Sequence, residues 1–176
     1  MSRSLFATVT FTVTAALAIS PANAAQKIDG KDKTFIQKAA QEQLAEIALG
    51  QLAMKKGSDK KVKEFAAELI EDHRYASQEA KDLSAKEGIY LPVEMDARQK
   101  KEQQRLSRLS GSDFDKAFIA HLLKTHRKDV HELQKTTATL KNENVKQWAE
   151  VTEPILAVHL KKAESVAEAL GVPESK

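Results

Sequence analysis

Three histidines and a glutamate occupy positions at which a helical bundle would bury side chains. His73, His126 and His159 fall in the apolar stripes of three different predicted helices, each near the midpoint of its helix. Glu46 has a comparable position on a fourth helix. A buried ionisable group is unfavourable unless it is paired, hydrogen-bonded or bound to a metal. The sequence therefore predicts a metal site inside the bundle, formed by Glu46, His73, His126 and His159.

The four candidate ligands are expected at one level of the bundle. The midpoints of the predicted long helices fall at about positions 44, 73, 126 and 156. Each candidate lies within about three residues of its midpoint, which is ~5 Å along a helix that rises 1.5 Å per residue. Midpoints align whether neighbouring helices run parallel or antiparallel, so this expectation does not depend on the topology.

The donor set narrows the choice of ion without identifying it. Three imidazoles and one carboxylate suit a single borderline ion such as zinc, copper, nickel, manganese or iron. A zinc ion with three histidines and an open position could be catalytic, whereas a fourth protein ligand would make a closed structural site. A metal-free hydrogen-bonded layer would give the same pattern of residues, and the sequence leaves that alternative open.

The pattern argues against a di-iron ferroxidase centre. Such bundles supply a Glu-x-x-His motif from each of two helices. Here the residues three positions before the histidines are all apolar, namely Ile70, Leu123 and Leu156. Iron storage and oxygen-dependent iron oxidation are therefore not expected.

Three carboxylates are candidates for hydrogen bonds to the ligands, although carboxylates are more often exposed. They are Asp72, beside His73, Asp129, one turn after His126, and Glu42, one turn before Glu46. His121 and His131 are each five residues from His126, about 140° around the helix at ~3.6 residues per turn. Both are expected at the surface.

The elements that position these residues are all helical. Long helices are predicted at about 32–56, 59–87, 113–140 and 145–170, with a shorter one at 94–109, and no internal repeat is evident. About 25 residues separate the second and third long helices, whereas antiparallel neighbours need only two to eight. The sequence predicts an all-α, ferritin-like four-helix bundle whose long connection contains the short extra helix.

Motifs in a fixed order along most of the chain resemble one known family. They are residues 35–40 (Phe-Ile-Gln-Lys-Ala-Ala), 44–47 (Leu-Ala-Glu-Ile) with 49–50 (Leu-Gly), 62–66 (Val-Lys-Glu-Phe-Ala) with 71–73 (Glu-Asp-His), 109–111 (Leu-Ser-Gly) with 113–115 (Asp-Phe-Asp), His126, and 154–156 (Pro-Ile-Leu) leading to His159. The chain resembles the ferritin-like family catalogued as domain of unknown function 4142. The resemblance implies a ferritin-like bundle with Glu46, His73, His126 and His159 at the positions that the family pattern marks.

Residues 1–24 have the features of a cleaved signal peptide. Arg3 precedes an apolar run over residues 5–19, which is shorter than the ~20 residues needed to cross a bilayer. Ala22-Asn23-Ala24 then gives a small-x-small cleavage pattern. The single domain is expected to comprise residues 25–176 and to be exported to the periplasm or beyond the cell. Without Cys anywhere, disulfides, thiolate metal sites and lipid attachment through cysteine are excluded.

The charge pattern and motifs leave two functional hypotheses. Without Arg3 the chain has 27 basic and 25 acidic residues, interspersed, so a nucleic-acid partner is not expected. No hydrolase motif, phosphate-binding loop or cysteine nucleophile is present, and enzymatic activity stays undecided. The first hypothesis is an exported metal-binding protein with a stress-protective or redox role. The alternative is a metal-free helical interaction module of the cell envelope, and the sequence leaves open both its partners and a homo-oligomer.

Overall fold

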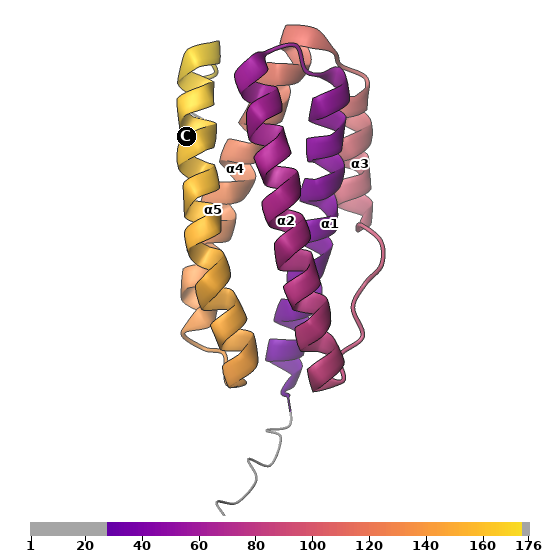
Figure 1. Cartoon of the computed structure of the whole chain (residues 1–176), viewed down its shortest axis with the longest axis vertical. Coiled ribbons are helices and arrows are strands. Elements are labelled where there is room, and N and C mark those ends of the chain that lie inside the picture. Colours follow the sequence, from indigo (N-terminus) through magenta and orange to yellow (C-terminus); the bar gives the residue numbers. More distant parts are fainter. Residues whose placement is uncertain (1–27, 174–176) are drawn as a thin grey trace, which may run out of the picture.

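A computed structural model describes residues 28–173, which contain five helices and no strand (Figure 1). The helices are α1 (Gly30–Lys56), α2 (Lys60–Glu87), α3 (Ala97–Ser107), α4 (Gly111–Thr137) and α5 (Glu143–Leu170). The predicted all-α bundle of four long helices and one short helix is confirmed. No helix within this range is long and apolar enough to cross a membrane. The predicted signal peptide lies outside the described residues.

Side-chain and glycine caps set the ends of the helices. The carboxylates of Asp29 and Asp59 accept backbone N–H groups in the first turns of α1 and α2, and the Asn142 side chain does the same for α5. These caps satisfy N–H groups that have no partner within the helix. Helices α2 and α5 end at Gly88 and Gly171, whose φ values of 66° and 63° are costly for residues with a Cβ.

The long helices form two antiparallel hairpins, α1–α2 and α4–α5, which pack side by side (Figure 1). Helix α2 packs on α5, and α1 packs on α4. The chain between α2 and α4 runs back along the bundle and carries α3, which packs against α1 and α4. The predicted long crossover is therefore confirmed.

Two apolar clusters fill the bundle, and a polar layer separates them. One cluster contains Leu49, Leu69, Leu123 and Ala163, and the other contains Ile36, Ala76, Leu133 and Ala149. On each long helix the polar residue of the layer lies between members of the two clusters. These residues are Glu46 on α1, His73 on α2, His126 on α4 and His159 on α5, none more than 4% exposed. The expected common level of the four residues is present in the structure.

Two buried aspartates tie the hairpins to each other at opposite ends of the bundle. Asp115, in the early part of α4, accepts hydrogen bonds at the α1–α2 turn from the backbone N of Ser58 and Asp59 and from the Ser58 hydroxyl (2.6 Å). Asp32, in the first turn of α1, accepts hydrogen bonds at the α4–α5 turn from the backbone N of Lys141 and Asn142 (2.6 Å for Asn142). Asp32 is 0% and Asp115 is 1% exposed. Each hairpin therefore contributes an aspartate that hydrogen-bonds to the turn of the other hairpin.

This reciprocity corresponds to a short repeat in the sequence. Residues 32–36 read Asp-Lys-Thr-Phe-Ile, and residues 115–119 read Asp-Lys-Ala-Phe-Ile. The number of residues between Asp32 and Asp115 is the same as that between Gln43 and His126, and as that between Glu46 and Asp129. Few other positions of the two hairpins share a residue type, so the similarity is confined to these short segments.

Gly50 marks the closest approach of α1 to α2. A Cβ at this position would lie 2.7 Å from Ile70 Cγ1 and 3.2 Å from the Ala66 carbonyl oxygen. We expect Gly50→Ala to reduce the free energy of unfolding by about 1–3 kcal/mol, because the added methyl overpacks a filled interface. Urea unfolding followed by circular dichroism measures the change. Gly30→Ala is the matched control, since no atom lies within 4 Å of its new Cβ, and equal losses in both variants would contradict this account.

Candidate metal centre

The three predicted histidines meet in the polar layer. One ring nitrogen of each of His73, His126 and His159 lies within 4.8 Å of those of the other two. The ring centroids are 5.3 Å apart for His73 and His159, 5.6 Å for His126 and His159, and 6.2 Å for His73 and His126. The rings come from α2, α4 and α5, so residues far apart in the sequence form one cluster.

Each imidazole is held through one ring nitrogen. His73 Nδ1 is 2.6 Å from the Gln43 side-chain oxygen, and His159 Nε2 is 2.8 Å from a carboxylate oxygen of Asp72. His126 Nδ1 is 3.2 Å from the carbonyl oxygen of Leu122, one turn earlier on its own helix. All three partners are acceptors, so these three ring nitrogens carry the hydrogen and donate it.

The second nitrogen of each ring has no partner among the described residues. These atoms are Nε2 of His73, Nε2 of His126 and Nδ1 of His159, all completely buried. Since the first nitrogen of each ring carries the hydrogen, the second carries a lone pair. Metal-ligating histidines have this arrangement, with one ring N–H given to a carboxylate or carbonyl and the other nitrogen directed at the ion.

Burial keeps the imidazoles in the form that binds metals. It lowers the pKa of His73 well below the usual 6.5 and that of His126 to about 3, and the neighbouring histidines add to both effects. Burial also lowers the pKa of His159, although the Asp72 carboxylate opposes that change. At neutral pH all three rings are uncharged, and a neutral imidazole is the form that coordinates a metal ion.

Glu46 lies in the same layer but outside the tight cluster. It is 4% exposed, and its Oε2 has no hydrogen-bond partner in the described part of the chain. Within residues 28–173, the group that meets the 4.8 Å spacing contains the three histidines and not Glu46. Burial, together with the nearby charges of Asp129 and Glu42, raises the pKa of Glu46 to about 8. Its role as fourth ligand stays a prediction.

The hydrogen-bond partners of the histidines differ from those that the sequence suggested. Asp72 bonds to His159 of the other hairpin and not to His73, its neighbour in sequence. His126 uses the carbonyl of Leu122 in place of Asp129. The partner of His73, Gln43, was missed. Gln43 lies one turn before Glu46 on α1. Its position on the buried face of the helix is the feature of the sequence that could have identified it as a partner of the histidines.

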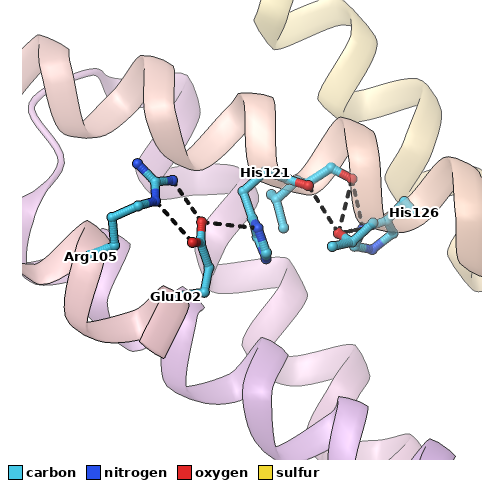
Figure 2. A network of polar contacts seen from close by, with 6 residues as sticks. Glu102, Arg105, His121 and His126 are labelled. Atoms are coloured by element: carbon cyan, nitrogen blue, oxygen red, sulfur yellow. Dashed lines mark hydrogen bonds and ion pairs between the residues drawn. The ribbon is translucent and has the colours of Figure 1, made fainter. Parts of the chain in front are cut away.

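The other two histidines of α4 lie away from the centre. His131 is exposed, as predicted. The His121 side chain is only 18% exposed, so its placement at the surface was wrong. Figure 2 shows His121 directed toward Glu102 of α3, and the Nδ1–Oε1 distance is 3.3 Å. Arg105 binds the same carboxylate through two nitrogens, at 2.9 and 2.6 Å. This network fastens the crossover helix to α4.

A cleft between α1 and α4 leads to the centre. It has a volume of about 620 Å³, and His73, His126 and Glu46 line its inner part. Apolar side chains including Phe35, Leu133, Trp148 and Leu156 form part of the wall, and charged residues of α1, α4 and the crossover surround them. The histidine cluster, although buried, is therefore reached from one face of the bundle.

Comparisons with known proteins agree with this architecture. A solved structure described as a crystal structure of a DUF305 fragment from Deinococcus radiodurans is 14% identical to this chain, with a TM-score of 0.71. The match covers 83% of this chain and 99% of that one, and it supports the helical fold alone. No curated protein matches the chain. The family described as Domain of unknown function (DUF4142) matches residues 17–166. Because that match spans most of the sequence, the chain belongs to the DUF4142 family.

Proposed function

We propose that this protein binds one divalent transition-metal ion through His73, His126 and His159, with Glu46 as the fourth ligand. The observation that carries the proposal is the orientation of the rings. Each has one nitrogen fixed by an oxygen acceptor and one buried lone pair without a partner in the described residues. The three rings also lie together, with one nitrogen of each within 4.8 Å of those of the other two.

A metal ion accounts for this arrangement better than a metal-free polar layer does. A buried acceptor that makes no hydrogen bond costs about 1–3 kcal/mol. A layer evolved only for hydrogen bonding would place the N–H of one ring toward the lone pair of the next. Here the three N–H groups bond to Gln43, Leu122 and Asp72, none of them a ring of the cluster, and the other three ring nitrogens have no partner in the described residues. A metal ion bound by these three nitrogens would accept the lone pairs that have no hydrogen-bond donor.

The donor set favours a borderline ion. Imidazole is a common ligand of zinc, copper, iron and nickel, and a carboxylate such as that of Glu46 is a common ligand of manganese. The chain has no cysteine, so thiolate ligation is excluded. With three histidines bound, a fourth position is left for Glu46 or for an exogenous ligand that enters through the cleft.

The leader sequence supports an exported, periplasmic location for this metal-binding protein. Arg3, the apolar run and the Ala22-Asn23-Ala24 pattern are the observations behind this part of the proposal. A protective role against metal or oxidative stress is compatible with a buried centre that a cleft reaches from the surface. The proposal therefore includes a protective role of this general kind and names no particular reaction.

Metal content of the mature protein tests the proposal. The protein is purified without a histidine tag or chelator and analysed by inductively coupled plasma mass spectrometry, beside His126→Ala and His131→Ala. We expect about one ion per chain in the wild type and in His131→Ala, whose exposed ring lies on the same helix. His126→Ala should contain none. An empty wild type that also takes up no added zinc, copper, manganese or iron would leave the metal-free polar layer as the remaining interpretation.

A further inference from the structure

Three carboxylates line the cleft at successive depths. The Glu42 side chain is 37% exposed and that of Asp129 is 27% exposed, whereas Glu46 is 4% exposed. All three line the cleft that also contains His73 and His126. Carboxylates therefore follow one another from the surface to the histidine centre.

Their positions on the helices bring these carboxylates to one seam. Glu42 and Glu46 are one turn apart on α1, and residues with this spacing are neighbours on a helix surface. Asp129 is one turn after His126 on α4, which packs against α1. All three carboxyl groups line the same cleft, so they lie along one seam between α1 and α4.

The inner end of this seam offers donor atoms to a cation. Glu46 Oε2, His73 Nε2 and His126 Nε2 are buried without partners in residues 28–173, and all three residues line the cleft. The nearby cationic side chains lie further out, where Arg98 is 3.7 Å from Glu42 and Lys128 is 4.0 Å from Asp129. A divalent cation entering the cleft would meet oxygen and nitrogen donors along its whole length, whereas an anion would find no such partners at the inner end.

The side of the centre at His159 is arranged differently. His159 is the ligand on that side, and it does not line the cleft. Its outer nitrogen, Nε2, is engaged by Asp72, whose side chain is 45% exposed. A cation arriving there meets a nitrogen that already carries a hydrogen.

We propose that the α1–α4 cleft is the path by which divalent cations enter the histidine centre, and that Glu42, Asp129 and Glu46 transfer them inward. This inference rests on the proposed function. Glu42 and Asp129 do not belong to the group that meets the 4.8 Å spacing within the described residues, so they pass an ion on to Glu46 and do not store one. Negative charge along a cleft raises cation association rates by roughly 10- to 1,000-fold, and salt weakens the effect.

Stopped-flow uptake of Cu²⁺ tests the path. The chain has one tryptophan, Trp148, which lines the cleft, and its fluorescence should be quenched when paramagnetic Cu²⁺ enters the centre. His126→Ala identifies the phase that reports on the centre, since this variant should lack it. We expect the double variant Glu42→Gln/Asp129→Asn to slow this phase at least about ten-fold at low ionic strength. The final stoichiometry should stay at one ion per chain.

Glu132→Gln is the matched control for the loss of charge. Glu132 also lines the cleft on α4, but its side chain is 59% exposed and pairs with Lys128 at 3.3 Å, so it lies further out than Glu42 and Asp129. The control should bind Cu²⁺ nearly as fast as the wild type. An unchanged rate in the double variant, or equal slowing by Glu132→Gln, would overturn the path. Loss of stoichiometric binding in the double variant would also overturn it, because Glu42 or Asp129 would then be a ligand.

The test separates this inference from the proposed function. A wild type that binds one Cu²⁺ at rates insensitive to the carboxylates contradicts the path and leaves the metal centre intact. A wild type that shows neither quenching nor bound copper contradicts both.

Discussion

Metal-free protein is expected to be most stable near pH 6.5 and to lose stability on both sides of that value. On the acid side the cause is the three buried histidines, whose pKa values are lowered from 6.5, to about 3 for His126. Below pH 6.5 the unfolded chain binds more protons than the folded one at these sites. Stability therefore falls with pH, by about 1.4 kcal/mol per pH unit for each such histidine.

On the alkaline side the cause is two buried carboxyls. Burial raises the pKa of Glu46 from 4.5 to about 8, and burial with the charge of Glu42 raises that of Asp129 from 3.8 to about 7. Above their unfolded pKa values the folded protein binds more protons than the unfolded chain, so stability falls as pH rises to about 8. Just below pH 6.5 the three histidines, together with His121, whose pKa burial also lowers, outnumber these two carboxyls, and above 6.5 only the carboxyls act.

Urea unfolding of the metal-free protein between pH 4 and 9 measures this profile. His126→Gln should flatten the acid side by the contribution of one histidine, whereas His131→Gln should not change it. Bound Zn²⁺ should raise stability at pH 7 by about 2.7 kcal/mol when its concentration is a hundred times Kd. Stability that stays constant from pH 6.5 to 4.5 would show that the histidines are not buried in the neutral form.

Asp115→Ala is expected to reduce the free energy of unfolding by about 3 kcal/mol. The substitution removes three hydrogen bonds to a buried carboxylate, two of them from the backbone N–H groups of Ser58 and Asp59. Hydrogen bonds to charged groups are each worth about 1.5–3 kcal/mol, and water reaching the vacated turn replaces part of that. Asp32→Ala should behave similarly, because Asp32 holds the α4–α5 turn.

Asp113→Ala is the control for this effect. Asp113 is in the first turn of the same helix but is exposed, so its loss should cost no more than about 1 kcal/mol, through the helix dipole. Chemical denaturation of the three variants at one pH gives the comparison. If Asp115→Ala and Asp113→Ala cost the same, the contact between the hairpins contributes no stability.

Local patterns were enough to predict the helices and the buried histidines. Asp59 and Gly88 signal the start and end of α2 through interactions within a few residues, which sequence reports directly. The apolar spacing around His73 and His126 identifies the buried face of each helix in the same way. The all-α bundle and the layer of histidines follow from these short-range rules.

The contacts between the hairpins could not be predicted in this way. Asp72 lies beside His73 in sequence but bonds to His159, because the packing of α2 on α5 decides which ring it reaches. His121 is covered by α3, whose position depends on the path of the crossover. Asp115 has the sequence signature of an ordinary carboxylate in the first turns of a helix. Only the position of the α1–α2 turn above it shows its role.

The two aspartate contacts also fix the distances between the candidate metal ligands of the two hairpins. His73 belongs to one hairpin, whereas His126 and His159 belong to the other. A slip of one hairpin along the other by a single residue would displace the His73 nitrogen by ~1.5 Å, most of a metal–ligand bond length. Asp115 prevents that slip from about 16 Å away, eleven residues before His126 on α4. In the proposed metal centre, the accepted ionic radius would thus be set by two turns that do not contact the ion, and substitutions there would change selectivity while every ligand stays the same.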